Sequence, residues 1–176
     1  MKNRSDRYGS VAVTFHWLSA LAILVLIGSG FGAAVTDDPA TKLGLLQLHV
    51  PLAITVFVLT LARIAWRWFA GRKPEPIAGT PRWQDAGARS VHFLLYLVLF
   101  VMIGSGIGLL AMSGAGNVLF SGTGTLPDFT AFPPHAAHLL GALLLVGLLV
   151  AHVGAALYHQ FVRRDGIFRR MWYGRG

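Results

Sequence analysis

The histidines are the residues of this sequence best suited to chemistry. The chain has 176 residues and no cysteine, and its seven histidines are His16, His49, His92, His135, His138, His152 and His159. An imidazole transfers protons near neutral pH and is the commonest protein ligand of metals. The absence of cysteine excludes disulfides, thiolate metal sites, iron–sulfur clusters and covalent c-type haem attachment.

The elements that must position these histidines are membrane-spanning helices. Apolar residues make up 55% of the chain and charged residues 12%, with a mean hydropathy of +0.60, whereas soluble domains are about 25% charged. Four apolar stretches cover residues 11–34, 43–66, 87–112 and 136–162, and each is long enough for a helix that crosses the bilayer. Strand-like alternation is absent, which argues against a β-barrel. The sequence predicts an all-α membrane protein in which residues 1–176 form a single four-helix domain.

The basic residues predict how the spans are oriented. Of the 15 Lys and Arg residues, 14 lie before the first span, around the second connection or after the fourth span, and only Lys42 lies on the other side. Because basic residues are retained on the cytoplasmic side, both termini are expected in the cytoplasm. This placement explains the net charge of +8 without a nucleic-acid partner, since neither base-stacking aromatics nor a recognition element accompany the basic residues.

The histidines within the spans are expected to form two layers. His49 and His138 lie toward the outer ends of their spans, whereas His16, His92 and His152 lie toward the inner ends. His138 and His152 are 14 residues apart, a spacing that returns to within about 40° of the same helix face after about 21 Å. One helix therefore offers an imidazole to each of two sites stacked across the membrane.

Haem suits this layered set better than the alternatives. A single intramembrane histidine is often a proton relay or a packing residue, and a structural zinc site needs four close ligands. Transporters place acidic residues in the membrane, but all seven acids here lie in loops or tails. A haem needs two axial ligands and apolar walls, and two histidine ligands favour electron transfer over oxygen binding. Two such sites would carry an electron across the bilayer.

A repeat relates the two halves of the chain. His16 precedes a Gly-Ser-Gly-Phe-Gly run at 28–32 by twelve residues, and His92 precedes Gly-Ser-Gly-Ile-Gly at 104–108 by the same spacing, at an offset of 76 residues. The pattern favours a duplicated two-helix hairpin, in which small residues allow a helix or a flat cofactor to approach closely. Spacing alone leaves open whether His16 or His92 pairs with His152.

Two arginines lie at the inner level of the second span. Arg63 follows His49 by 14 residues and so occupies the place that His152 has in the fourth span, and Arg67 lies one turn further on. They are either donors to a haem propionate or snorkelling residues at the membrane edge. His135 and His159, taken singly, are better suited to proton relay or hydrogen-bonded packing.

Short motifs follow one another along the chain. They are Thr-Phe-His-Trp at 14–17, Leu-His at 48–49, Arg-Ile-Ala-Trp-Arg at 63–67, His-Phe-Leu-Leu-Tyr at 92–96, then His138, His152, Ala-Ala-Leu at 155–157, His159, Arg-Arg-Asp-Gly at 163–166 and Arg-Arg-Met at 169–171. With these motifs the chain resembles the bacterial di-haem cytochrome b561 family over nearly its whole length.

The resemblance implies a multi-pass protein of the bacterial inner membrane with two b haems among four helices. It implies that His16 and His152 ligate the inner haem, and that His49 and His138 ligate the outer haem. Members of the family look like quinone-linked electron carriers, and one branch is associated with oxidising superoxide and reducing ubiquinone.

We therefore expect a transmembrane oxidoreductase, surrounded by lipid, that takes electrons from a periplasmic donor such as superoxide. The electrons pass through the two haems to ubiquinone or another quinone near the cytoplasmic face, where His92 and His159 are candidates for binding the quinone or supplying protons. The competing hypothesis is a haem-bearing membrane anchor that exchanges electrons with a soluble dehydrogenase or hydrogenase. A non-haem proton or metal transporter is a third hypothesis, which a colourless protein would indicate. The sequence leaves open the direction of electron flow and the oligomeric state, including a homodimer.

Overall fold

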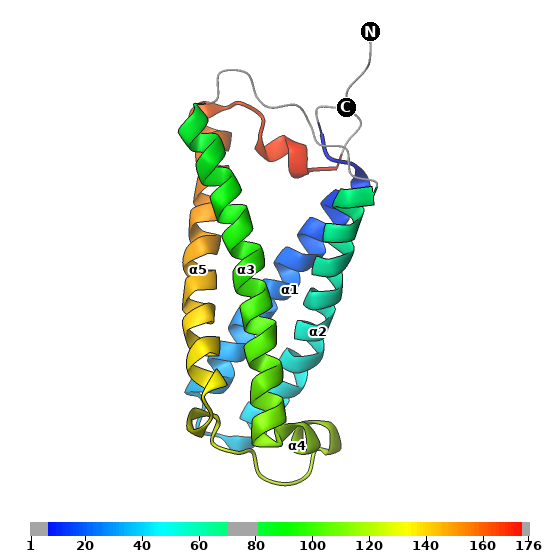
Figure 1. Cartoon of the computed structure of the whole chain (residues 1–176), viewed down its shortest axis with the longest axis vertical. Helices are drawn as coiled ribbons and strands as arrows, with labels where there is room; N and C mark the ends of the chain where they lie inside the picture. Colours follow the sequence, from blue (N-terminus) through cyan, green and yellow to red (C-terminus); the bar gives the residue numbers. More distant parts are fainter. Residues whose placement is uncertain (1–6, 70–80, 174–176) are drawn as a thin grey trace.

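Four long helices form the molecule. The computed structural model describes residues 7–69 and 81–173, and the long helices are α1 Ser10–Val35, α2 Pro39–Phe69, α3 Arg82–Ser113 and α5 Pro134–Tyr158 (Figure 1). Shorter elements are the helix α4 Ala115–Ser121, the 3-10 turns η1 Phe129–Ala131 and η3 Phe168–Met171, and a π-helical turn, η2 His159–Arg163, that continues α5.

The four spans expected from the sequence each lie inside one of these helices. By length and composition, all four helices could cross a membrane, and the described residues contain no strand, so the prediction of an all-α four-helix membrane bundle is confirmed. In hydrocarbon only a helix satisfies its own backbone polar groups within one segment. Large apolar side chains such as Leu21, Leu24 and Val150 are more than 60% exposed, as is expected of surfaces that lipid covers.

Local signals set the ends of the helices. The Asp38 carboxylate accepts a hydrogen bond of 2.9 Å from the backbone N–H of Thr41 and so caps the start of α2, where Pro39 occupies the first turn. α3 ends at Gly114, whose φ of 68° lies in the left-handed region that glycine adopts without strain. Gln47 donates a hydrogen bond of 2.9 Å to the Leu119 carbonyl and so ties α4 to α2.

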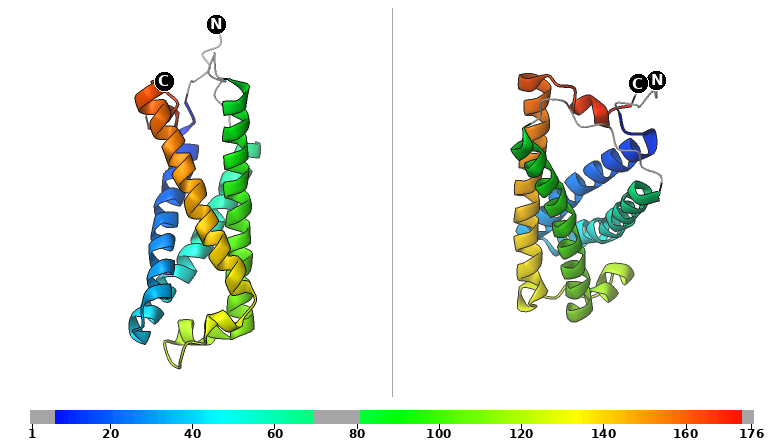
Figure 2. Two further views of the ribbon diagram at one scale, coloured as in Figure 1. Left: turned by 90° about the vertical axis from the view of Figure 1, so that its left-hand side faces the viewer. Right: turned by 45° about the horizontal axis from the view of Figure 1, so that its top comes forward.

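The bundle consists of two hairpins. α1 packs mainly against α2, and α3 packs mainly against α5, as the views in Figures 1 and 2 show. The hairpins meet at mid-height in an apolar cluster made of Ala22, Ile23, Val56, Val98, Leu145 and Leu148. We call the end of the bundle at which α1 begins and α5 ends the terminal end, and the opposite end, where α4 lies, the loop end. The basic residues Lys2, Arg4, Arg72, Lys73 and Arg175 lie outside the described residues.

Candidate functional site

Two histidines face each other near the loop end. The ring centroids of His49 on α2 and His138 on α5 are 6.3 Å apart, with an interplanar angle of 64°. Each ring also contacts the serine of a repeated Gly-Ser-Gly run: His49 Nδ1 lies 3.1 Å from Ser29 Oγ, and His138 Nδ1 lies 2.9 Å from Ser105 Oγ. The predicted outer layer is therefore a pair of histidines held by matching serine contacts.

The serine contacts select which ring nitrogen is available to a metal. Ser29 Oγ donates its hydrogen to the Leu26 carbonyl at 3.2 Å, and Ser105 Oγ donates to the Met102 carbonyl at 3.0 Å. Since each hydroxyl has one hydrogen, it accepts a hydrogen bond from the Nδ1–H of the facing histidine. That tautomer leaves the Nε2 lone pair for a metal, which is how outer hydrogen bonds orient a ligating imidazole.

The repeat seen in the sequence is also a repeat of contacts. Residues of α1 and α3 correspond at an offset of 76 (16 to 92), and residues of α2 and α5 at an offset of 89 (49 to 138). Under these offsets the first hairpin's contacts recur in the second: Ser29–His49 as Ser105–His138, Gly30–His49 as Gly106–His138, and Gly32–Leu45 as Gly108–Pro134. The residues of the central core obey the same correspondence, with Ala22 matching Val98 and Val56 matching Leu145.

The glycines beside the outer pair give a prediction with a built-in control. A Cβ added at Gly30 would lie 3.1 Å from His49 Cε1, whereas one added at Gly106 would lie 3.5 Å from His138 Cε1. We expect Gly30→Ala to displace the His49 ring at a cost of about 1 kcal/mol or more and to lower haem retention, with Gly106→Ala close to the unmodified protein. Haem retention during dilution of each purified variant measures the difference. Equal retention in the two variants would contradict it.

Three histidines gather toward the terminal end. His152 on α5 has His16 of α1 at a ring-centroid distance of 6.2 Å and an interplanar angle of 65°. The centroid of His92 on α3 is closer to His152, at 5.3 Å and 68°. The predicted inner layer is therefore brought together, and the His16–His152 geometry repeats that of His49–His138 within 0.1 Å and 1°. His92 differs from the other two in having an exposed side chain.

The spacing of the rings distinguishes the pairs. With metal–nitrogen bonds of about 2.0 Å and about 1.1 Å from each nitrogen to its ring centre, two imidazoles on opposite faces of one metal have centroids about 6.2 Å apart. His49–His138 and His16–His152 have this spacing, whereas His92–His152 is too close by nearly 1 Å. In the described part of the chain no group of three or more His, Cys, Asp or Glu side chains could hold a metal ion. The paired imidazoles therefore suit an iron whose other four ligands come from a porphyrin.

The arginines of the second span lie beside the inner histidines. Arg63 interacts electrostatically with His16, His92 and His152, and Arg67 interacts with His92. Arg63 is half-buried and Arg67 is exposed. A guanidinium at this level can donate two parallel hydrogen bonds to a carboxylate, so the structure brings both arginines to where a haem propionate would lie.

His159 is paired with an acid that the sequence reasoning did not single out. Its Nδ1–H donates to Asp165 Oδ2 at 2.5 Å, and both side chains are largely buried. The Arg163 Nε–H lies 3.3 Å from the same oxygen, and the Arg163 guanidinium also donates to Gln84 of α3 at 3.0 Å. The carboxylate thus holds the imidazole in one tautomer and leaves Nε2 as the atom that can accept or release a proton.

The ion pairs make the turn after α5 sensitive to acid. Burial would raise the pKa of Asp165, but hydrogen bonds from His159 and the Ile167 amide, with the charges of His159 and Arg163, hold that pKa below its usual 3.8. A lowered carboxyl pKa stabilises the fold above the unfolded pKa, and this contribution is lost as the pH falls through the folded value. We expect hydrogen exchange of the Ile167 amide to be constant from about pH 5 to 8 and to accelerate below about pH 4. Acceleration that begins above pH 5 would contradict this assignment.

The segment after η2, residues 164–173, folds back onto α1, and we call it the C-terminal hook. It begins with Arg164, whose φ of 53° is left-handed, and it crosses the terminal end of the bundle (Figure 1). Trp17 Nε1 donates to the Met171 carbonyl at 2.8 Å, and the Thr14 and Tyr173 hydroxyls are hydrogen-bonded at 2.9 Å. These contacts join residues more than 150 positions apart, and the only sequence signal was the mixture of arginines and aromatics in the tail.

The remaining histidine lies beside the outer pair. His135 is half-buried at the start of α5, and it interacts electrostatically with His138 and with Asp128. Its ring pairs with neither His49 nor His138 in the manner of the layered histidines, in agreement with its expected place as a neighbour of the outer pair.

Comparisons with known proteins agree with this architecture. Cytochrome b561 homolog 2 of Escherichia coli (strain K12) is 28% identical, over 96% of this chain and 93% of that protein. Cytochrome b562 of Cereibacter sphaeroides is 30% identical, over 93% of this chain and 94% of that protein. The protein named Probable superoxide oxidase CybB in Yersinia pestis is 26% identical, over 94% of this chain and 95% of that protein.

The family match covers nearly all the elements described above. The sequence model for prokaryotic cytochrome b561 matches residues 7–174, a range that runs from the first described residue through the four helices to the hook. The chain therefore belongs to the prokaryotic cytochrome b561 family, multi-pass bacterial membrane proteins that transfer electrons through haem b.

Proposed function

We propose that this protein carries electrons across the bacterial inner membrane through two b haems, from a periplasmic donor to a membrane quinone. The observation that carries the proposal is the pair of matched histidine geometries, 6.2 Å at one end of the bundle and 6.3 Å at the other. Each pair has the spacing of two axial ligands. When bound, each haem accepts and passes on one electron at a time.

His49 and His138 are the proposed ligands of the centre at the loop end. Their rings lie against Gly30 and Gly106, where a Cβ would meet each imidazole at 3.1 and 3.5 Å. The absence of side chains at these glycines leaves room for the rings beside the helix backbones, and the serine contacts direct Nε2 away from Nδ1 and its partner. Side-chain room and a selected tautomer are what a bis-histidine centre requires of its surroundings.

His16 and His152 are the proposed ligands of the centre at the terminal end. Ser19, three residues after His16, is buried, and its hydroxyl has no partner among the described residues. A buried polar group without a partner is rare in a folded protein, so this hydroxyl supports the presence of a bound group or water near His16. Arg63 and Arg67 are the proposed donors to the propionates.

The terminal end is proposed to lie in the cytoplasm, since most basic residues of the chain lie there and basic residues stay on that side. The loop end then faces the periplasmic donor. In its described residues the loop end carries Asp37, Asp38 and Asp128 against Lys42. This surface gives no electrostatic attraction to an anionic donor. If superoxide is the donor, its rate of reaction should therefore not fall as salt is added, in contrast to a reaction that positive charge accelerates.

His92 and His159 are the proposed proton-handling groups at the quinone end. His92 is exposed beside the His152 ring, and Asp165 orients His159 with its Nε2 available. A quinone takes up one proton for each electron it accepts, and an imidazole is suited to deliver protons near neutral pH.

A spectrum and a turnover measurement test the proposal together. We expect a reduced-minus-oxidised visible spectrum of two low-spin b haems per chain, and oxidation of the reduced protein by decylubiquinone. A colourless protein would overturn the haem proposal, and two haems without quinone-dependent oxidation would overturn the quinone. Stoichiometric co-purification of a soluble dehydrogenase or hydrogenase subunit would instead favour the membrane-anchor hypothesis.

A further inference from the structure

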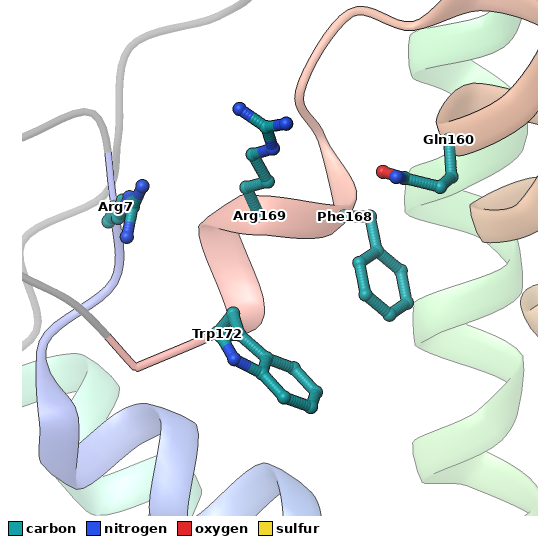
Figure 3. Close-up of a pocket in the computed structure, with 5 residues that line it drawn as sticks. All are labelled: Arg7, Gln160, Phe168, Arg169 and Trp172. Atoms are coloured by element: carbon teal, nitrogen blue, oxygen red, sulfur yellow. The ribbon is translucent and has the colours of Figure 1, made fainter.

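The C-terminal hook forms one side of a pocket at the terminal end. The pocket has a volume of about 360 Å³ and is lined by Arg7, Gln160, Phe168, Arg169 and Trp172. Figure 3 shows the Phe168 and Trp172 rings projecting to the same side of η3, with the Arg169 guanidinium on the other side. Gln160 reaches toward η3 from the end of α5, and Arg7 lies on the opposite flank. The pocket thus combines flat aromatic surface with amide and guanidinium donors.

This combination fits a flat ring that carries oxygen acceptors at its edge. Aromatic side chains stack on planar rings, and the amide of Gln160 and the guanidinium groups are hydrogen-bond donors. The volume lies near the lower limit of small-molecule sites, about 300 Å³, which suits one substituted ring with its tail outside the pocket. A quinone head group has this shape and has two carbonyl acceptors.

The aromatic wall is adjacent to the proposed inner centre. The Trp172 ring packs edge-on against Trp17 with centroids 5.6 Å apart, and Trp17 packs against His16 at 5.4 Å. Phe168 stacks beside Trp172 at 6.1 Å and 24°. A single side chain, that of Trp17, therefore connects the pocket wall to a proposed haem ligand. The hydrogen bond from Trp17 to Met171 fixes the hook in this position.

We propose that this pocket binds the head group of the quinone substrate, an inference that rests on the proposed function and adds the location of the site. Phe168 and Trp172 support the ring, and Gln160 and Arg169 donate to its carbonyl oxygens. Two electrons, delivered singly from the inner centre, and two protons from the cytoplasmic side convert the quinone to the quinol, with one O–H bond formed at each former carbonyl. The donor at the loop end supplies both electrons and is oxidised by two electrons in total.

Quinone binding by the purified, haem-loaded protein tests the location. We expect Trp172→Ala to raise the dissociation constant for decylubiquinone, measured by equilibrium dialysis, about three- to tenfold, and Arg169→Gln to raise it by a similar factor. Trp172→Phe keeps an aromatic surface and should stay within about twofold of the unmodified protein. In stopped-flow oxidation of the reduced haems, the half-saturating quinone concentration should rise in parallel.

The controls separate this inference from the function on which it rests. Trp68→Ala removes an 80% exposed tryptophan of α2 that does not line the pocket, and it should leave the dissociation constant unchanged. An unmodified protein that does not bind decylubiquinone overturns both the quinone and the pocket. Binding that Trp172→Ala and Arg169→Gln leave intact, in variants with unchanged haem spectra, overturns the pocket alone. If these variants instead lose co-purified anionic phospholipid with quinone binding unchanged, the pocket is a lipid site.

Discussion

His49→Ala and His138→Ala should each reduce the haem content from two per chain to one. Each replacement leaves the loop-end iron with one protein ligand, which weakens haem binding, whereas the chain still inserts because insertion depends on the apolar spans. The two variants should have the same spectrum, that of the remaining centre at the terminal end. The pyridine haemochrome assay against protein concentration measures the ratio.

His135→Ala is the matched control for this experiment. It removes an imidazole three residues from His138 that interacts with His138 electrostatically, and it should keep both haems. Two haems per chain in both His49→Ala and His138→Ala would show that the loop-end pair is not a ligand pair.

The inner pair gives a second large effect, with three variants that have different expected outcomes. His16→Ala and His152→Ala should each abolish the haem at the terminal end, because their rings have the separation of two axial ligands. His92→Ala should keep two low-spin haems, because its ring lies at 5.3 Å, too close to His152 for the two to bind one iron from opposite faces. Its effect should appear in the rate of quinone reduction or in the pH dependence of that rate.

The same set of variants can contradict the assignment directly. If His92→Ala loses the terminal-end haem and His16→Ala keeps it, His92 is the ligand and the pairing is reversed. Low-temperature electron paramagnetic resonance distinguishes the outcomes further, because a centre with one remaining histidine changes its spin state, whereas a bis-histidine centre remains low-spin.

The layers of histidines could be predicted from the sequence because they depend on local properties. The length of an apolar stretch determines whether it spans the bilayer, and the helix rise and period place His138 and His152 on one face about 21 Å apart. The distance of each histidine from the end of its span then assigns it to a layer. For the same reason the predicted spans lie inside the observed helices, and differences arise only at the ends, where Asp38 and Pro39 start α2 earlier than the apolar pattern does.

The choice of partner within the inner layer was decided only by the tertiary structure. His16 and His92 occupy equivalent positions in the sequence repeat, so no spacing distinguishes them. Their distances from His152 differ by 0.9 Å because the two hairpins cross with different geometry, and helix crossing depends on side-chain packing between segments remote in sequence.

The hook was likewise decided by contacts that no local pattern encodes. Thr14 and Tyr173 are 159 residues apart, and Asp165 reaches His159 only because the chain leaves α5 through a π-helical turn and a left-handed Arg164. Hydrophobic periodicity describes one helix at a time. The sequence by itself therefore determined which helices form and which histidines share a level, and the tertiary structure decided which imidazoles face each other and what covers the terminal end.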